Sequence, residues 1–200
     1  NPPASVSYRW GGDSENLQDS TQQLGMALGI SIFLIYALLA AQFENFLLPF
    51  IILGSVPLSL IGIIIGLVVF GQPVDVMVMV GLILLAGVVV NNAIVLIDFI
   101  QLTIERGSSR IEAVVESCRT RLRPILMTTM TTVLGMLPLS LGIGEGFENY
   151  RGMAITVMFG LSFSTILTLV IIPILFTLVE DFIEKLGKVL KKLFNKKSAE

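Results

Sequence analysis

The stretch Gly87–Ile100, GVVVNNAIVLIDFI, is almost entirely apolar, yet it carries two adjacent asparagines, Asn91 and Asn92, and an aspartate, Asp98. Amide and carboxylate side chains are costly to place in hydrocarbon. The stretch lies within a longer apolar run, and a run of about 20 apolar residues is long enough to cross a bilayer as a helix. It therefore predicts a membrane-spanning helix whose polar residues have a structural or functional reason to be there.

The composition of the whole chain is typical of a polytopic membrane protein. Of its 200 residues, 54% are hydrophobic and 14% are charged, whereas a soluble domain carries about 25% charged residues. There is no histidine and one cysteine, Cys118, which excludes a disulfide within the chain and a Cys/His zinc site. The start lacks the pattern of a signal peptide. We expect the chain to be part of a longer protein.

Five segments are long and apolar enough to span a membrane, and they predict an all-α fold. They cover about residues 23–42, 46–70, 76–102, 124–143 and 152–178. Short links make neighbouring spans antiparallel. We assign 1–21 to the end of an extracytoplasmic region, with one strand in SVSYRWGG. Residues 22–180 form the transmembrane bundle, and 181–200 form a basic cytoplasmic tail.

The basic residues predict the orientation of the bundle. Eleven of the thirteen lysines and arginines fall on the side that holds Arg106 to Arg123 and the C-terminal tail, whereas Arg9 and Arg151 fall on the other. Cytoplasmic loops carry such an excess of basic residues. We expect a multi-pass protein of the cell (cytoplasmic or inner) membrane with a cytoplasmic C-terminus, in contact with membrane lipid.

Between the third and fourth spans, Ser108–Thr120 predicts a short helix on the cytoplasmic surface. Ser109 followed by Glu112 fits a capping box. The apolar residues that share one face at helical spacing are Ile111, Val114, Val115 and Cys118. Pro124 then suits the first turn of the fourth span, where its missing N–H does no harm.

Two polar ladders have the same spacing. Asn91 and Asp98 are seven residues apart on the third span, and Arg121 and Thr128 are seven apart on the fourth. Residues seven apart lie on one helix face. Because the two spans are antiparallel, we predict Asp98 opposite Arg121 and Asn91 opposite Thr128.

Other polar and small residues are better explained by packing. Hydrogen bonding between helices is the favoured interpretation for Asn92, Thr129, Thr131 and Thr132. Close helix packing is favoured for two G-x-x-x-G pairs, Gly25/Gly29 and Gly62/Gly66. Kinks are expected at Pro57, Pro138 and Pro173.

Three motifs together resemble one family. LAAQFENFLLPFIILGSVPLSLIG, GVVVNNAIVLIDFI and TRLRPILMTTMTTVLGMLPLSLGIGEG are similar to segments of the resistance–nodulation–division (RND) efflux permeases of the AcrB-like hydrophobe/amphiphile type. The resemblance implies that the five predicted spans are the last five of a twelve-span permease. It implies a secondary active transporter, not an enzyme, that exports drugs or other amphiphiles by proton antiport.

The resemblance also implies a proton relay. The family's threonine falls on Thr128 and its arginine on Arg121, and a lysine of the best-studied pumps falls on Asn91. An asparagine cannot carry charge, so the relay would be modified here. We take Asn91, Asn92, Asp98, Arg121 and Thr128 as the candidate relay residues. No cofactor is expected beyond the coupling proton.

The expected partners are the N-terminal part of the permease, with its acidic pair, and two further copies in a homotrimer. A periplasmic adaptor and an outer channel are also implied, and nucleic acid is not. One alternative is a SecDF-like protein-export accessory of the same superfamily. Another is a fragment that transports nothing in isolation and acts as a scaffold. An intramembrane protease is disfavoured, because the chain has one suitable aspartate and no histidine.

Overall fold

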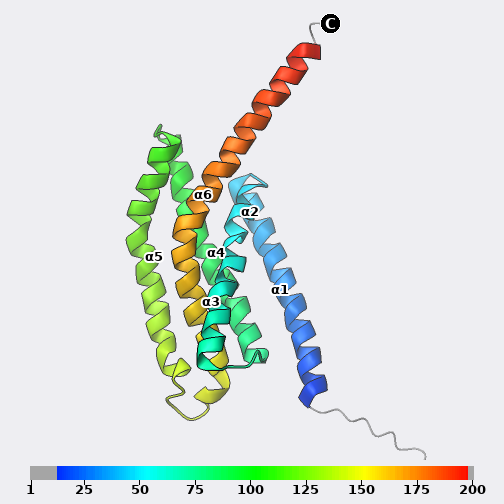
Figure 1. The fold of residues 1–200 in the computed structure, drawn as a ribbon, viewed down its shortest axis with the longest axis vertical. Helices are drawn as coiled ribbons and strands as arrows, with labels where there is room; N and C mark the ends of the chain where they lie inside the picture. Colours follow the sequence, from blue (N-terminus) through cyan, green and yellow to red (C-terminus); the bar gives the residue numbers. More distant parts are fainter. Residues whose placement is uncertain (1–12, 198–200) are drawn as a thin grey trace, which may run out of the picture.

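The computed structural model describes residues 13–197, and this part of the chain is all-α, as predicted (Figure 1). The helices are α1 (Asp13–Phe43), α2 (Leu48–Leu53), α3 (Ser55–Phe70), α4 (Val76–Glu105), α5 (Arg110–Ser140), the 3₁₀ helix η1 (Phe147–Tyr150) and α6 (Arg151–Lys197). Five candidate spans are long and apolar enough to cross a membrane. The strand expected in residues 5–12 lies outside the described residues.

The last helix, α6, is the centre of the bundle. It packs against α3, α4 and α5, while α1 packs against α4 and α2. One core cluster joins α1, α2, α4 and α6 and includes Leu39, Ile52, Leu96, Ile97 and Phe176. A second joins α3, α4 and α6 around Ile63, Leu85, Val89 and Ile155. Because α4 contributes to both clusters, one of its faces is firmly buried and its orientation is fixed.

The second span is divided into α2 and α3, where we predicted one segment over 46–70. The division falls at Gly54. Pro57 has no N–H to donate to the carbonyl of Leu53, so the regular helical bonds fail there. The Oγ of Ser55 donates instead to the Ile52 carbonyl at 2.6 Å, which satisfies one of the acceptors at the break. By contrast, α5 and α6 continue through Pro138 and Pro173.

The expected surface helix over 108–120 is not a separate element. It forms the first turns of α5, which continues through Pro124, so Pro124 lies inside the helix and not in its first turn. The capping box is confirmed: Ser109 Oγ accepts from Glu112 N at 3.4 Å, and Ser109 N donates to Glu112 Oε2 at 3.2 Å. The lost hydrogen bond at Pro124 is tolerated within so long a helix.

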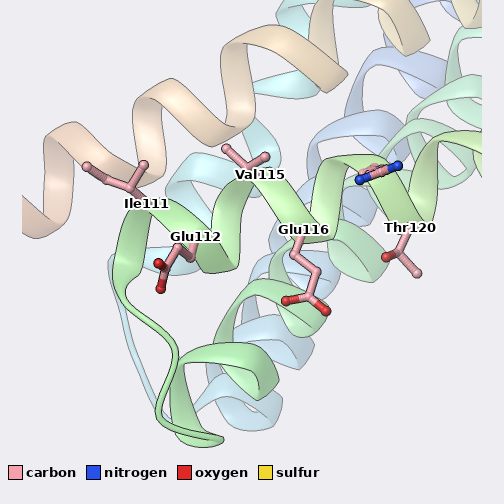
Figure 2. A pocket seen from close by; sticks show the side chains of 6 residues that line it. Ile111, Glu112, Val115, Glu116 and Thr120 are labelled. Atoms are coloured by element: carbon pink, nitrogen blue, oxygen red, sulfur yellow. The ribbon is translucent and has the colours of Figure 1, made fainter.

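The predicted apolar face of this segment is split. Val114 and Cys118 pack against the first core cluster, whereas Ile111 and Val115 are exposed. Figure 2 shows Ile111 and Val115 on these first turns with Glu112 and Glu116, around a shallow hollow on the surface of α5. Packing of one side against the bundle holds the segment in line with the span.

One of the two glycine pairs packs as predicted. A Cβ at Gly66 would lie 2.7 Å from Cβ and Cγ of Phe159, and Gly62 lies against Phe159 and Phe163. The backbones of α3 and α6 therefore approach closely along this pair. A Cβ added at Gly25 or Gly29 would have no described atom within 4 Å, so close packing at that pair is not found within the described bundle.

Candidate functional site

The polar residues of α4 lie on the face that the bundle leaves open. Asn91 and Asp98 are both exposed, together with Leu84, Val88 and Leu102, while Ala93, Leu96 and Ile97 on the opposite face are fully buried. The spacing of seven residues therefore places Asn91 and Asp98 on one face, as predicted. Among the described residues, α1 borders this face at Asn91, where a hollow separates the two helices.

The predicted placement of Asp98 opposite Arg121 is not found in this structure. Within the described part of the chain, the ion pairs found do not join these two side chains. The guanidinium carbon of Arg121 instead lies 4.6 Å from the ring centroid of Phe99. Phe99 follows Asp98 directly, so Arg121 lies at the predicted depth along α4. The side chain of Phe99, however, points about 100° away from that of Asp98 around the helix axis.

Arg121 has an unsatisfied donor. Its Nε is buried and has no hydrogen-bond partner among the described residues. A buried N–H of a charged group without a partner is costly, and native structures rarely leave one so. The cation–π contact with Phe99 offsets part of this cost. A water molecule, or an acceptor outside the described residues, would satisfy this donor.

Asn91 and Thr128 are not hydrogen-bonded to each other. Asn91 lines a hollow of about 320 Å³ between α1 and α4, together with Leu34, Leu38 and Ile94. Thr128 is exposed on α5 and donates its hydroxyl to the carbonyl of Ile125 at 2.9 Å. The predicted Asn91–Thr128 contact is therefore not formed, although both side chains remain open to a further partner.

The threonines of α5 behave in two ways. Thr131 and Thr132 donate to the carbonyls of their own helix, at 2.8 and 2.9 Å. Thr129 is buried and shares a 3.0 Å hydrogen bond with Thr165 of α6. The interpretation as a bond between helices is thus confirmed for Thr129. Asn92, for which the same interpretation was favoured, is half-buried on α4.

Sequence reasoning missed several polar residues of α6. Thr165 and Thr168 are almost fully buried, and the Oγ1 of Thr168 has no partner among the described residues. Beyond the apolar part of α6, Asp181 accepts from Arg110 at 2.8 Å, and Glu180 lies 3.7 Å from the same guanidinium. These pairs fix the start of α5 against α6. The run SFSTILT was the available signal for the buried hydroxyls.

Long apolar helices that carry amides, a carboxylate and an arginine are typical of a polytopic membrane protein with a functional polar site in its bundle. The chain belongs to the AcrB/AcrD/AcrF family, which matches residues 1–180. This confirms the resemblance to RND efflux permeases that the three motifs indicated. Among the side chains that the structure describes, no group of three or more His, Cys, Asp or Glu is placed to hold a metal ion.

Individual relatives support the same membership. The chain is 41% identical to the swarming motility protein SwrC of Bacillus subtilis over 184 residues, 92% of this chain and 18% of that protein. It is 37% identical to the cobalt-zinc-cadmium resistance protein CzcA of Cupriavidus metallidurans, over 88% of this chain and 17% of that one. It is 35% identical to the multidrug resistance protein MdtF of Escherichia coli, over 93% of this chain and 18% of that protein.

A solved structure of a heavy metal efflux pump has the same fold. It superimposes with a TM-score of 0.78 at 37% identity and covers 89% of this chain, which corresponds to 18% of the pump. The chain thus spans less than a fifth of the length of the relatives it matches. The match to the AcrB/AcrD/AcrF family and to a heavy metal efflux pump favours the efflux branch over the protein-export alternative.

Proposed function

We propose that this chain is the C-terminal transmembrane part of an RND efflux permease driven by proton antiport. In this proposal the protein is a secondary active transporter of the inner or cytoplasmic membrane, with its C-terminus in the cytoplasm. It works as a homotrimer with a periplasmic adaptor and an outer channel. Its own N-terminal part contributes the other spans.

The observation that carries the proposal is the open polar face beside an unsatisfied arginine. Asn91 and Asp98 are exposed on α4, Thr128 is exposed on α5, and the Nε of Arg121 is buried without an acceptor among the described residues. Charged and polar groups at membrane depth are costly unless they are paired. Carboxylates on the other spans would supply these pairs and would be the groups that take up and release protons.

Each candidate residue then has a role that suits its chemistry. Arg121 keeps its charge at all relevant pH values, so it would stabilise the ionised form of a carboxylate brought beside it. Thr128 and Asn91 can donate hydrogen bonds to the same carboxylates, and Asn92 can assist from the half-buried side. Asp98 would add a negative charge near the end of α4. Because Asn91 is neutral, proton release would depend more on Arg121 than in a relay with a lysine.

The cargo has two candidates. Drugs or other amphiphiles are our first proposal, and the likeness to MdtF, a multidrug resistance protein, supports it. Divalent metal cations are the second, supported by the likeness to CzcA and to the heavy metal efflux pump structure. Accumulation of a fluorescent dye and of zinc in cells with and without the intact protein separates the two.

The test of proton coupling uses the intact protein that carries this sequence, reconstituted into liposomes that hold a pH-sensitive dye. Arg121→Ala and Thr128→Ala are expected to abolish substrate-dependent proton flux while leaving the amount of inserted protein unchanged. Thr131→Ala is the matched control, because Thr131 is equally exposed on α5 and bonds its own helix in the same way. Normal proton flux in both Arg121→Ala and Thr128→Ala would refute the relay.

A further inference from the structure

Two hollows on α5 run into each other. The first is lined by Arg119, Leu122, Arg123, Leu126, Met127 and Met130. The second, of about 300 Å³, lies between α5 and α6 and shares Leu126 and Met130 with the first. It continues along Val133 and Leu134 of α5 and Ile166 of α6. Together they form one groove, the α5–α6 groove, with two arginines at one end and apolar walls along the rest.

The position of this groove relative to a membrane follows from the charges on α5. Arg123 is the last charged residue before 21 uncharged ones, Pro124–Gly144. The helical part of this run ends with α5 at Ser140 and has 17 residues, which at 1.5 Å per residue are about 25 Å long, close to the hydrocarbon thickness of about 30 Å. Arg119 and Arg123 therefore lie at the boundary of the membrane, and the apolar part of the groove lies within the hydrocarbon.

The two arginines are available to an anion. They are four residues apart, so they share one face of the helix, and both are exposed. Neither makes an ion pair or hydrogen bond with another described residue, in contrast to Arg110, which pairs with Asp181 and Glu180. Arg121, between them, faces Phe99 instead. Arg119 also lines the hollow on the first turns of α5, which holds Glu112 and Glu116 (Figure 2). No ion pair joins Arg119 to either carboxylate among the described residues, whereas Arg123 lies outside that hollow.

The rest of the groove suits a hydrocarbon chain better than a polar ligand. Three hydroxyl groups reach its lining, those of Thr129, Ser162 and Thr165. Thr129 and Thr165 are bonded to each other at 3.0 Å, and Ser162 donates to the Met158 carbonyl at 2.7 Å. Because these hydroxyls already have partners, the groove offers an incoming molecule mainly apolar contact.

We propose that the α5–α6 groove binds an anionic glycerophospholipid. The phosphate of the headgroup lies between Arg119 and Arg123, where charge-assisted hydrogen bonds to guanidinium groups are strong. One acyl chain follows Leu126 and Met130 into the apolar groove. The site is independent of the relay residues, so it stands whether or not Arg121 and Thr128 couple to protons.

The test is native mass spectrometry of the intact protein in neutral detergent, titrated with phosphatidylglycerol or phosphatidylcholine. The wild-type protein is expected to retain phosphatidylglycerol preferentially. Arg119→Gln/Arg123→Gln should weaken phosphatidylglycerol binding about 25-fold, because each near-surface cation contributes about a factor of five to anionic lipid binding. The control Arg106→Gln/Lys185→Gln removes the same charge from exposed positions outside the groove and should leave binding within about twofold.

A second variant tests the apolar part. Val133→Trp fills the groove and should reduce the binding of both lipids, whereas Ile174→Trp, at an exposed position of α6 outside it, should not. Equal binding of the two lipids by the wild-type protein would overturn the proposal. So would equal losses in the two double variants, or binding of inorganic phosphate as tight as that of phosphatidylglycerol.

Discussion

The close approach of α3 and α6 at Gly66 leads to a quantitative prediction. A Cβ placed on Gly66 would lie 2.7 Å from Cβ and Cγ of Phe159, where ordinary contacts are 3.4–4 Å. In Gly66→Ala the two helices must therefore separate by about 0.7 Å or more, and overpacking of this kind costs about 1–3 kcal/mol. The same substitution also gains about 1 kcal/mol of helix propensity, which partly hides the cost.

The second glycine pair provides the control that isolates the packing cost. Gly29 lies in the middle of α1, in the same G-x-x-x-G spacing, and has no described atom within 4 Å of an added Cβ. Gly29→Ala gains the same propensity without the clash. The difference between the two variants should therefore be about 1–3 kcal/mol in the free energy of unfolding. Gly135→Ala, also in open space on α5, is a second control, in case another part of the intact protein packs against Gly29 of α1.

The measurement is reversible unfolding of the purified protein in mixed detergent–SDS micelles, followed by circular dichroism. Gly66→Ala should unfold at lower SDS fraction than either control. If Gly66→Ala and Gly29→Ala change the free energy of unfolding equally, α3 and α6 do not pack at this glycine and the reasoning fails.

Three further predictions concern single contacts. A double-mutant cycle of Thr129→Val and Thr165→Val should give a coupling energy of about 0.6 kcal/mol, the average for hydrogen bonds between membrane helices, and a cycle without coupling would contradict the bond. Ser109→Ala should lower the stability of the first turn of α5 by about 1 kcal/mol, seen as faster amide exchange at Glu112, whereas Ser108→Ala should not. Asn91→Lys in the intact protein should change the number of protons moved per substrate, and unchanged coupling would refute the altered relay.

The sequence predicted most of the helices because their signals are local. Runs of apolar residues mark the spans, and the Ser109–Glu112 capping box marks the start of α5 within one residue. The same local reasoning misplaced Pro124, because a proline suits the first turn of a helix but is also tolerated within a membrane helix whose neighbours support it. The kink expected at Pro57 falls three residues earlier, at Gly54, because the hydrogen bond that a proline lacks is the one to the residue four before it.

For the candidate site, the sequence predicted the level of the residues along the helix axes but not the directions in which their side chains point. Spacing along two antiparallel helices places Asp98 and Arg121 at one level, and the contact of Arg121 with Phe99 agrees with that level. The rotation of each helix about its axis depends on how the whole bundle packs, which periodicity within one helix does not determine. For the same reason, Thr165 was not foreseen as the partner of Thr129, since 36 residues separate them.

The length of α6 has a practical consequence for measuring motion. This helix has 47 residues, about 70 Å, which is more than twice the hydrocarbon thickness of about 30 Å, and its last part projects beyond the other helices (Figure 1). A projecting helix that moves with the bundle amplifies rotation. Over the 16 residues after Asp181, about 24 Å, a 10° tilt moves the tip by about 4 Å. A spin label or fluorophore near Lys197 would thus act as a pointer, reporting small rocking movements of the membrane bundle from outside the lipid.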